Sequence, residues 1–117
     1  MPAAPRQTEA DSDVEDRIDV FRAIADPTRR AILDHLSAGP ATVNALAANF
    51  VQTRPGISKH LRVLRECGVV TESKSGRERH YRLRPAALQP VDTWLMRYRA
   101  LWSVQLNALK AYLETDQ

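Results

Sequence analysis

Cysteine is nearly missing from this sequence. Its 117 residues include a single one, Cys67. One cysteine cannot form a disulfide within the chain, which agrees with a reducing compartment. Long apolar runs are missing as well: none approaches the length of a membrane span, and residues 1–15 lack the apolar segment of a signal peptide. We therefore predict a cytoplasmic protein with no membrane partner.

The residue groupings on which enzymes depend are also missing. No glycine-rich phosphate loop follows a predicted strand, and no nucleophile, base and orienting residue fall on one predicted surface. We therefore expect neither catalysis nor a cofactor. A length of 117 residues with a hydrophobic fraction of 44% is that of one ordinary globular domain.

What the chain has in excess is basic charge in one segment. Residues 54–84 contain nine Lys or Arg against three Asp or Glu (+6), and the rest contains eight against eleven (−3), which sums to the net charge of +3. Concentrated Arg and Lys suit a phosphate backbone, because they displace its condensed counterions. The segment therefore favours nucleic acid as a partner, and a solvated charged face is the plainer alternative.

The N-terminal part of the chain predicts an arm followed by two helices. Residues 1–13 hold acids and prolines but almost no large apolar residue, so we expect a disordered arm, with the domain spanning residues 14–117. Asp26 and Pro27 separate the helices, since Asp caps free N–H groups and Pro is tolerated at the first helical position. The second helix ends at Gly39-Pro40. The apolar faces of the two helices are Val14, Ile18, Phe21, Ile24 and Ala25, and then Ile32, Leu33 and Leu36.

Two short capped helices follow. Thr42 is predicted to cap the third and Thr53 the fourth, with residues 49–52 as a short turn between them. Gly68 stands where a left-handed residue closes the fourth helix. Two short helices joined by a tight turn, the second one basic, form a helix-turn-helix. Their predicted buried side chains are Val43, Leu46, Ala47 and Phe50 in the third helix, and Ile57, Leu61 and Leu64 in the fourth.

A hairpin and a long helix complete the chain. Residues 69–73 and 79–83 are predicted strands around a tip at residues 74–77, and a helix-turn-helix with such a hairpin is a winged helix. We therefore predict a mainly α fold of about five helices plus a two-stranded wing. The last helix, roughly residues 91–113, carries one continuous apolar stripe. The stripe consists of Val91, Trp94, Leu95, Tyr98, Leu101, Trp102, Leu106, Leu109, Tyr112 and Leu113.

Three segments share their residues, order and spacing with a known family. They are F-R-A-I-A-D-P-T-R-R-A-I-L at residues 21–33, R-P-G-I-S-K-H-L-R-V-L-R at residues 54–65, and the strand–wing–strand matches at Gly68-Val69-Val70, Gly76-Arg77 and Tyr81-Arg82-Leu83. Together they resemble the ArsR family of winged-helix transcriptional regulators, over about residues 14–113. The resemblance implies a homodimer that binds an operator and represses transcription, often of its own gene.

Two groups of side chains are the candidates for DNA contact. Side chains near the start of a recognition helix reach base edges in the major groove, and an arginine at a hairpin tip enters the minor groove. The candidates are Gln52, Thr53, Arg54, Ser58, Lys59, His60 and Arg62 at the fourth helix, and Lys74, Arg77 and Arg79 in the wing. The alternatives are a helix cap for Thr53, a half-buried hydrogen-bonding role for His60, and wing charges that protect a solvated edge.

The stripe of the last helix predicts the oligomeric state. It is more apolar surface than so small a domain covers from its own side, so we predict a dimer seam, with an internal core or a ligand pocket as alternatives. A two-fold dimer presents two recognition helices to half-sites about one DNA turn apart, roughly 34 Å, so we expect an inverted-repeat operator in double-stranded DNA. The predicted interface residues are Ile18, Phe21, Trp94, Leu95, Tyr98, Leu101, Trp102, Leu106 and Leu109.

Many members of the resembled family sense metal ions through cysteine pairs in the third helix or Asp, His and Glu sets in the last. This sequence has no Cys or His in residues 42–50 or 91–113, and Asp92 and Glu114 are too far apart to form a site. Because transition metals select thiolate and imidazole, we predict a metal-independent regulator. Cys67 lacks a resolving partner, so a packing role is favoured over redox sensing. An organic inducer and control without any ligand both stay open.

Two other functions compete with the sequence-specific repressor. A basic winged helix can dock an acidic protein, which predicts salt-labile binding to any polyanion without sequence preference. Winged helices also serve as dimerisation modules of methyltransferases, which the missing catalytic groups exclude. A specific regulator instead binds its site tighter than random DNA by roughly 10³ or more.

Overall fold

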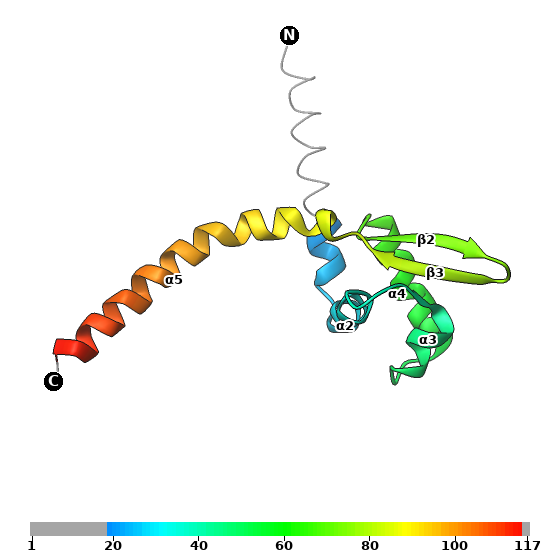
Figure 1. Ribbon diagram of the computed structural model, residues 1–117, viewed down its shortest axis with the longest axis horizontal. Helices are drawn as coiled ribbons and strands as arrows, with labels where there is room; N and C mark the ends of the chain where they lie inside the picture. The colour runs from blue at the N-terminus through cyan, green and yellow to red at the C-terminus, as the bar shows by residue number, and fades with distance from the viewer. Residues whose placement is uncertain (1–18, 116–117) are drawn as a thin grey trace, which may run out of the picture.

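The computed structural model describes residues 19–115, which form a small helical unit with a hairpin on one side and a long helix on the other (Figure 1). The predicted winged helix-turn-helix is confirmed. The predicted arm, Val14 and Ile18 lie outside the described residues. In chain order the elements are helical residues 19–24, α2 (Pro27–Leu36), β1 (Ala41–Thr42), α3 (Val43–Ala48), α4 (Arg54–Glu66), β2 (Val70–Ser75), β3 (Glu78–Leu83), the 3-10 helix η1 (Pro85–Leu88) and α5 (Gln89–Thr115).

Side-chain caps determine where α2, α3 and α4 begin. In each case an oxygen of the residue before the helix accepts a hydrogen bond from a backbone N–H that the first turn leaves without a partner. All three predicted caps are confirmed. The pairs are Asp26 with the N–H of Arg29 at 3.0 Å, Thr42 with that of Ala45 at 3.1 Å, and Thr53 with that of Gly56 at 3.3 Å.

One hydrophobic core joins α2, α3, α4 and the sheet. The spacing of the core positions in α4 places them on one side of the helix, so its other side is left to solvent. Phe50, predicted on the third helix, lies beyond its end and is half-buried. The largest fully buried side chains are Ile32, Leu46, Ile57, Leu61, Leu64 and Val69.

The predicted two-stranded wing is confirmed as the β2–β3 hairpin, and a third strand that the sequence did not predict, β1, joins it in one sheet. The strand order is β1-β3-β2, and both pairings are antiparallel. In β1, Ala41 lies opposite Tyr81 and Thr42 opposite His80. Two residues are too few for an alternating pattern, so β1 is defined only by its pairing with β3.

The hairpin turn is tighter than predicted. Ser75 pairs with Glu78, which leaves Gly76 and Arg77 as the two-residue turn. The positive φ of Gly76, +63°, suits the first central position of a type II′ turn. Toward the tip, β2 therefore extends two residues further than predicted and β3 one residue further. Arg77, at the tip, lies in this short turn.

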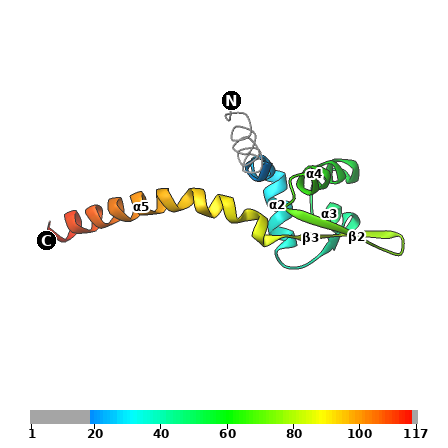
Figure 2. The ribbon, with the colours of Figure 1, turned by 90° about the horizontal axis from the view of Figure 1, so that it is seen from above.

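Helix α5 leaves the rest of the molecule. It begins at Gln89 and not after Pro90 as predicted, because proline in a first helical turn gives up no hydrogen bond. Its 27 residues span about 40 Å. Figures 1 and 2 show it projecting away from the helical unit, on the side opposite to the hairpin. We call residues 19–88 the compact unit and residues 96–115, all of which are exposed, distal α5.

Candidate nucleic-acid interface

Helix α4 turns a basic side to solvent. Arg54, Ser58, Lys59 and Arg62 are all exposed. Helical geometry places Lys59 and Arg62 almost opposite the buried face that contacts the core. Arg62 Nε lies 3.3 Å from Glu66 Oε1, an exposed pair four residues apart that contributes little energy. The outward side of α4 therefore offers cations that a phosphate or a base edge can engage.

Arginines of α4 and of the hairpin border one cleft of about 170 Å³. Arg54 comes from the start of α4, and the other two arginines come from the hairpin tip and β3. Guanidinium groups recognise phosphate through paired hydrogen bonds, so a cleft bordered by three of them suits a DNA backbone. Helix and wing thus form one surface. The cleft is lined by Thr42, Val43, Asn44, Arg54, Arg77, Glu78 and Arg79.

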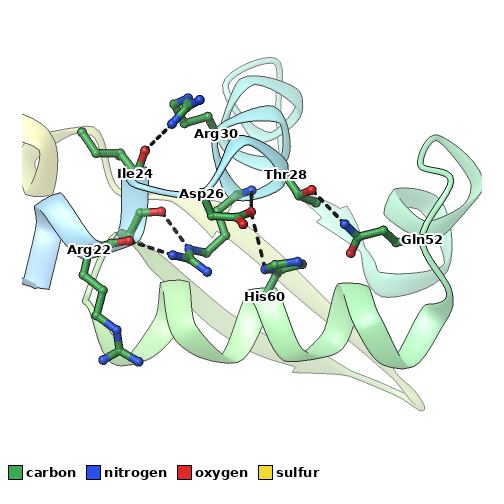
Figure 3. Close-up of polar contacts among 9 residues, drawn as sticks. Arg22, Ile24, Asp26, Thr28, Arg30, Gln52 and His60 are labelled. Atoms are coloured by element: carbon green, nitrogen blue, oxygen red, sulfur yellow. Dashed lines mark hydrogen bonds and ion pairs between the residues drawn. The ribbon is translucent and has the colours of Figure 1, made fainter.

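Gln52 and His60 both contact α2 (Figure 3), although Gln52 remains exposed and only His60 is half-buried. Gln52 Nε2 donates a hydrogen bond to Thr28 Oγ1 at 2.8 Å, and His60 Nδ1 lies 3.9 Å from Asp26 Oδ2. The His60 side chain is only 21% exposed. The geometry therefore favours the half-buried role for His60, and it makes Gln52 a tie between the turn and α2.

Asp26 connects the start of α2 with α4. The hydrogen bond from the backbone N–H of Arg29 is the main cause that lowers the pKa of the Asp26 carboxyl below its ordinary 3.8. Desolvation acts in the opposite direction, and the nearby His60 and Arg29 lower the pKa further. Asp26 is therefore ionised at neutral pH, as a helix cap that also faces His60 requires.

Two arginines of α2 close the preceding helical segment, a role that the sequence did not predict. The guanidinium of Arg29 donates to the carbonyl oxygens of Ala23 at 2.9 Å and Arg22 at 2.8 Å. Arg30 Nη1 donates to the carbonyl oxygen of Ile24 at 2.8 Å (Figure 3). These carbonyls lie at the end of a helix, where the carbonyl of Arg22 also accepts from the N–H of Ala25 at 3.2 Å, and the guanidinium groups supply partners that the helix does not. The position of Arg29 and Arg30 shortly after a helix break was the available signal.

The wing arginine Arg79 is paired within the chain. Its Nη1 lies 3.3 Å from Glu72 Oε1, while Arg65 Nη1 and the Tyr81 hydroxyl donate to Glu72 Oε2 at 2.7 and 2.9 Å. Burial by itself raises the pKa of Glu72, but the hydrogen bond from Tyr81 and the charges of Arg65 and Arg79 outweigh it and lower that pKa below its ordinary 4.5. The pKa of Tyr81 is raised by burial and by its bond to Glu72. Glu72 was not among the predicted residues, since only the folding of α4 against the hairpin assembles its partners.

The remaining wing candidates lie in solvent. Lys74 and Arg77 are exposed, and Lys74 lies opposite Arg79 in the hairpin. Thr53 caps α4, which is the alternative that the sequence offered to DNA contact. Ser58 is exposed on α4. Arg54, Arg77 and Arg79 therefore border one cleft, Lys59 lies on the outward side of α4, and Gln52 and His60 contact α2.

Residues 19–115 contain no group of three or more His, Cys, Asp or Glu side chains placed to hold a metal ion. Cys67 is half-buried and packs against the core. Desolvation raises the pKa of its thiol, so at neutral pH it lacks the thiolate character of a reactive cysteine. The structure thus favours the packing role. In the part of the chain that the structure describes, no helix combines the length and apolarity needed to cross a bilayer.

The predicted interface residues of α5 form an exposed stripe. Near its start, Phe21 meets Trp94 edge-on with ring centroids 5.6 Å apart, and Trp94 lies 5.0 Å from Tyr98. Leu95 is half-buried. Farther along, the exposed members are Leu101, Trp102, Leu106 and Leu109, with exposed fractions between 50% and 65%.

Comparison with known proteins gives consistent relatives. Residues 26–72 match the family model described as bacterial regulatory protein, arsR family. The chain is 38% identical over 79 residues to the transcriptional repressor SdpR of Bacillus subtilis, covering 68% of this chain and 88% of that protein. It is 34% identical over 96 residues to the HTH-type transcriptional regulator Rv2034 of Mycobacterium tuberculosis, covering 82% of this chain and 87% of that one.

Solved structures share the fold. An ArsR-like transcriptional regulator from Rhodococcus sp. RHA1 is 35% identical, with a TM-score of 0.66 over 85% of this chain and 93% of that chain. A homodimeric winged helix-turn-helix DNA-binding domain from Mycobacterium bovis superposes with a TM-score of 0.65 at 23% identity, over 79% of this chain and 87% of that one. At that identity the second likeness concerns the fold alone.

Proposed function

Since the chain belongs to the ArsR family of bacterial regulatory proteins and is a DNA-binding transcriptional regulator, we propose that it is a homodimeric, metal-independent repressor that binds an inverted-repeat operator. The observation that carries this proposal is the single basic surface made by the outward side of α4 and the hairpin arginines around one cleft. An apolar stripe on α5, away from that surface, supplies the complementary means of pairing two copies.

On DNA, α4 lies in the major groove and the hairpin tip follows the minor groove. Lys59 and Arg62, the outermost cations of α4, are our candidates for base contact, because Lys and Arg bind the major-groove acceptors of guanine. Arg54 and Arg77 border the cleft and are assigned to phosphates, and Thr53, which directly precedes Arg54, keeps its cap role. Arg79 is held by Glu72, so its part is secondary.

The stripe of α5 supports a second copy of this chain as its partner. Trp102 and Leu109 are 50% and 54% exposed on a helix that projects from the compact unit. A continuous apolar face of this size on a lone helix is uncommon on monomers and is typical of protein–protein contact. Phe21, already packed on Trp94, extends the same apolar surface onto the compact unit.

Repression without metal follows from two further points. The relative SdpR is named as a transcriptional repressor, and we extend that role to this chain. Residues 42–50 and 91–113 lack the Cys and His side chains that transition metals select. We expect the protein to act in the cytoplasm, where bacterial DNA is found, and its own promoter is a natural first target to examine.

The test selects the operator from a random duplex library by repeated rounds of binding and amplification with the wild-type protein. Fluorescence anisotropy at two salt concentrations then compares the selected duplex with a scrambled one. We expect the selected duplex to bind at least about 10³-fold tighter at both salt concentrations, and its sequence to be an inverted repeat.

Two lysine variants assign the surface. Lys59→Ala should weaken binding to the selected duplex roughly tenfold or more, because one base contact is lost. The control Lys110→Ala removes the same charge from exposed distal α5 and should leave affinity unchanged. If the wild-type protein instead bound the selected and the scrambled duplex equally, and lost both as the salt concentration rose, the alternative of a basic surface that docks an acidic protein would be supported.

A further inference from the structure

Helix α4 and the hairpin meet at one backbone joint. Between the end of α4 and the start of β2 stands Gly68 with a φ of +77°. The backbone N–H of Val69 donates to the carbonyl of Leu64 at 3.1 Å, and the N–H of Arg84 donates to the carbonyl of Val69 at 2.8 Å. These bonds hold the base of the hairpin, whereas its outer half extends beyond the body of the molecule (Figure 2). Val70 and Tyr81 near this base are buried in the core shared with α4, so these contacts hold the base of the hairpin but do not set the angle of its outer half.

Glu72 supplies a second point of attachment. Its carboxylate receives Arg65 from α4 on one side, and Tyr81 and Arg79 from β3 on the other, with all three contacts between 2.7 and 3.3 Å. The Glu72 side chain is only 18% exposed, so these contacts are shielded from water more than an ordinary surface ion pair. Among residues 19–115, the Arg65–Glu72 pair is the one ion pair that joins α4 to the hairpin.

The position of Glu72 in the sheet explains how it reaches both elements. It lies on the same side of β2 as the buried Val70 and directly opposite Tyr81, which is 7% exposed. Its carboxylate therefore sits at the edge of the core, where the apolar contacts between hairpin and helix end. The lowered pKa of Glu72 agrees with a carboxylate that is ionised when it receives both arginines.

We propose that Glu72 is a positioning residue that sets the angle between α4 and the hairpin, and with it the spacing between the DNA contacts of these two elements. This inference rests on the proposed function, because it concerns how one surface is presented to DNA. By engaging Arg65 and Arg79, Glu72 also keeps two guanidinium groups from binding phosphate without regard to sequence.

Two substitutions with opposite charge changes test this role. Glu72→Gln raises the net charge by one and Arg65→Gln lowers it by one, yet each breaks the same attachment. Using the selected and scrambled duplexes, we expect the ratio of the two affinities to fall roughly tenfold in both variants, as for the loss of one well-placed base contact. Affinity for the scrambled duplex alone should rise in Glu72→Gln and fall in Arg65→Gln.

The double variant and a mobility measurement separate positioning from charge. The ratio in Glu72→Gln/Arg65→Gln should be about tenfold below wild type and not a hundredfold, since one attachment is lost in all three proteins. Backbone ¹⁵N relaxation of residues 75–78 should report larger motion in every variant. An unchanged affinity ratio in Glu72→Gln, or a hundredfold loss in the double variant, would overturn the proposal.

Tyr81→Phe is a milder variant that tests the same contact in case the Glu72 and Arg65 variants fail to fold. It removes only the hydroxyl that donates to Glu72 and keeps the ring in the core, and we expect the affinity ratio to fall about threefold. An unchanged ratio in this variant counts against the proposal. If the wild-type protein itself enriches no duplex, the proposed function fails; if it does and the Glu72 variants keep its preference, only the role of Glu72 fails.

Discussion

Distal α5 is richer in apolar residues than the compact unit, yet the two regions bury them to opposite extents. In the compact unit, Ile57, Leu61 and Leu64 are fully buried by neighbouring elements. In distal α5, Leu101, Trp102 and Leu109 are each at least half exposed. A helical apolar pattern therefore predicts which face of a helix will be buried, but not whether the same chain or another one buries it. Here the compact unit is covered by itself, and we propose that distal α5 is covered by a second copy.

Charges follow the same division. In the compact unit, Glu72 is held by groups from α4 and β3, and Asp26 accepts from the N–H of Arg29 and faces His60 of α4; both carboxyls have a lowered pKa. The charged side chains on distal α5 are exposed. Substitutions in the two regions should consequently differ in kind: those in the compact unit change folding, and those in distal α5 change association.

The largest effect is expected from a charge placed in the α5 stripe. Trp102→Glu buries an unpaired carboxylate in each copy of the dimer, so we expect dimerisation to weaken by about 4 kcal/mol, roughly a thousandfold. Sedimentation equilibrium measures the dissociation constant, and circular dichroism reports whether the compact unit stays folded.

Met96→Glu is the matched control for this change. Met96 is 58% exposed and lies roughly 120° around α5 from Trp102, on the polar side. It should leave the dissociation constant nearly unchanged. A wild-type-like dimer in Trp102→Glu would place the interface elsewhere and would remove the basis for the comparison of the two regions.

A pair of leucine truncations is expected to have the next largest effect. In the monomeric Trp102→Glu background, Leu61→Ala should lower the free energy of unfolding by about 3 kcal/mol, because it leaves a cavity in the core. Leu109→Ala, the same truncation in distal α5, should change it by less than about 0.5 kcal/mol. Urea unfolding followed by circular dichroism measures both. Similar losses in the two variants would mean that distal α5 is covered within its own chain.

The smallest effect is expected in how the stability contributed by Glu72 depends on pH. A carboxyl whose pKa is lower in the folded than in the unfolded state stabilises the fold above its unfolded pKa, and this contribution is lost as the pH falls through the folded pKa. For Glu72 the loss should therefore begin below about pH 4.5, its ordinary pKa. Wild type should be more stable than Glu72→Gln at pH 7, and the difference should shrink toward pH 3.

Thermal unfolding at equal protein concentration over this pH range measures the difference between the two proteins. A difference that does not depend on pH would show that the contacts of Glu72 act through shape and not through its charge. That result would mean that titration of Glu72 does not cause the loss of stability of the compact unit in acid.

Much of the fold was predictable because the interactions that define it are local. The caps at Asp26, Thr42 and Thr53 each act on a backbone N–H three residues away, and glycines at 68 and 76 mark the two positive-φ positions around the hairpin. Apolar spacing along α4 predicted its buried side, and the count of charges predicted that its other side is basic. The sequence by itself thus determined the helices, the helix-turn-helix, the wing and the concentration of cations.

The tertiary structure decided what depends on contacts between distant segments. The pairing of β1 with β3, the inward turn of His60 toward Asp26, and the partners of Glu72 all join residues that no local pattern connects. It also decided the direction of α5, which carries its stripe away from the compact unit. Local hydrogen bonds and periodicity act over three or four residues, whereas these features arise only when packing brings separate elements together.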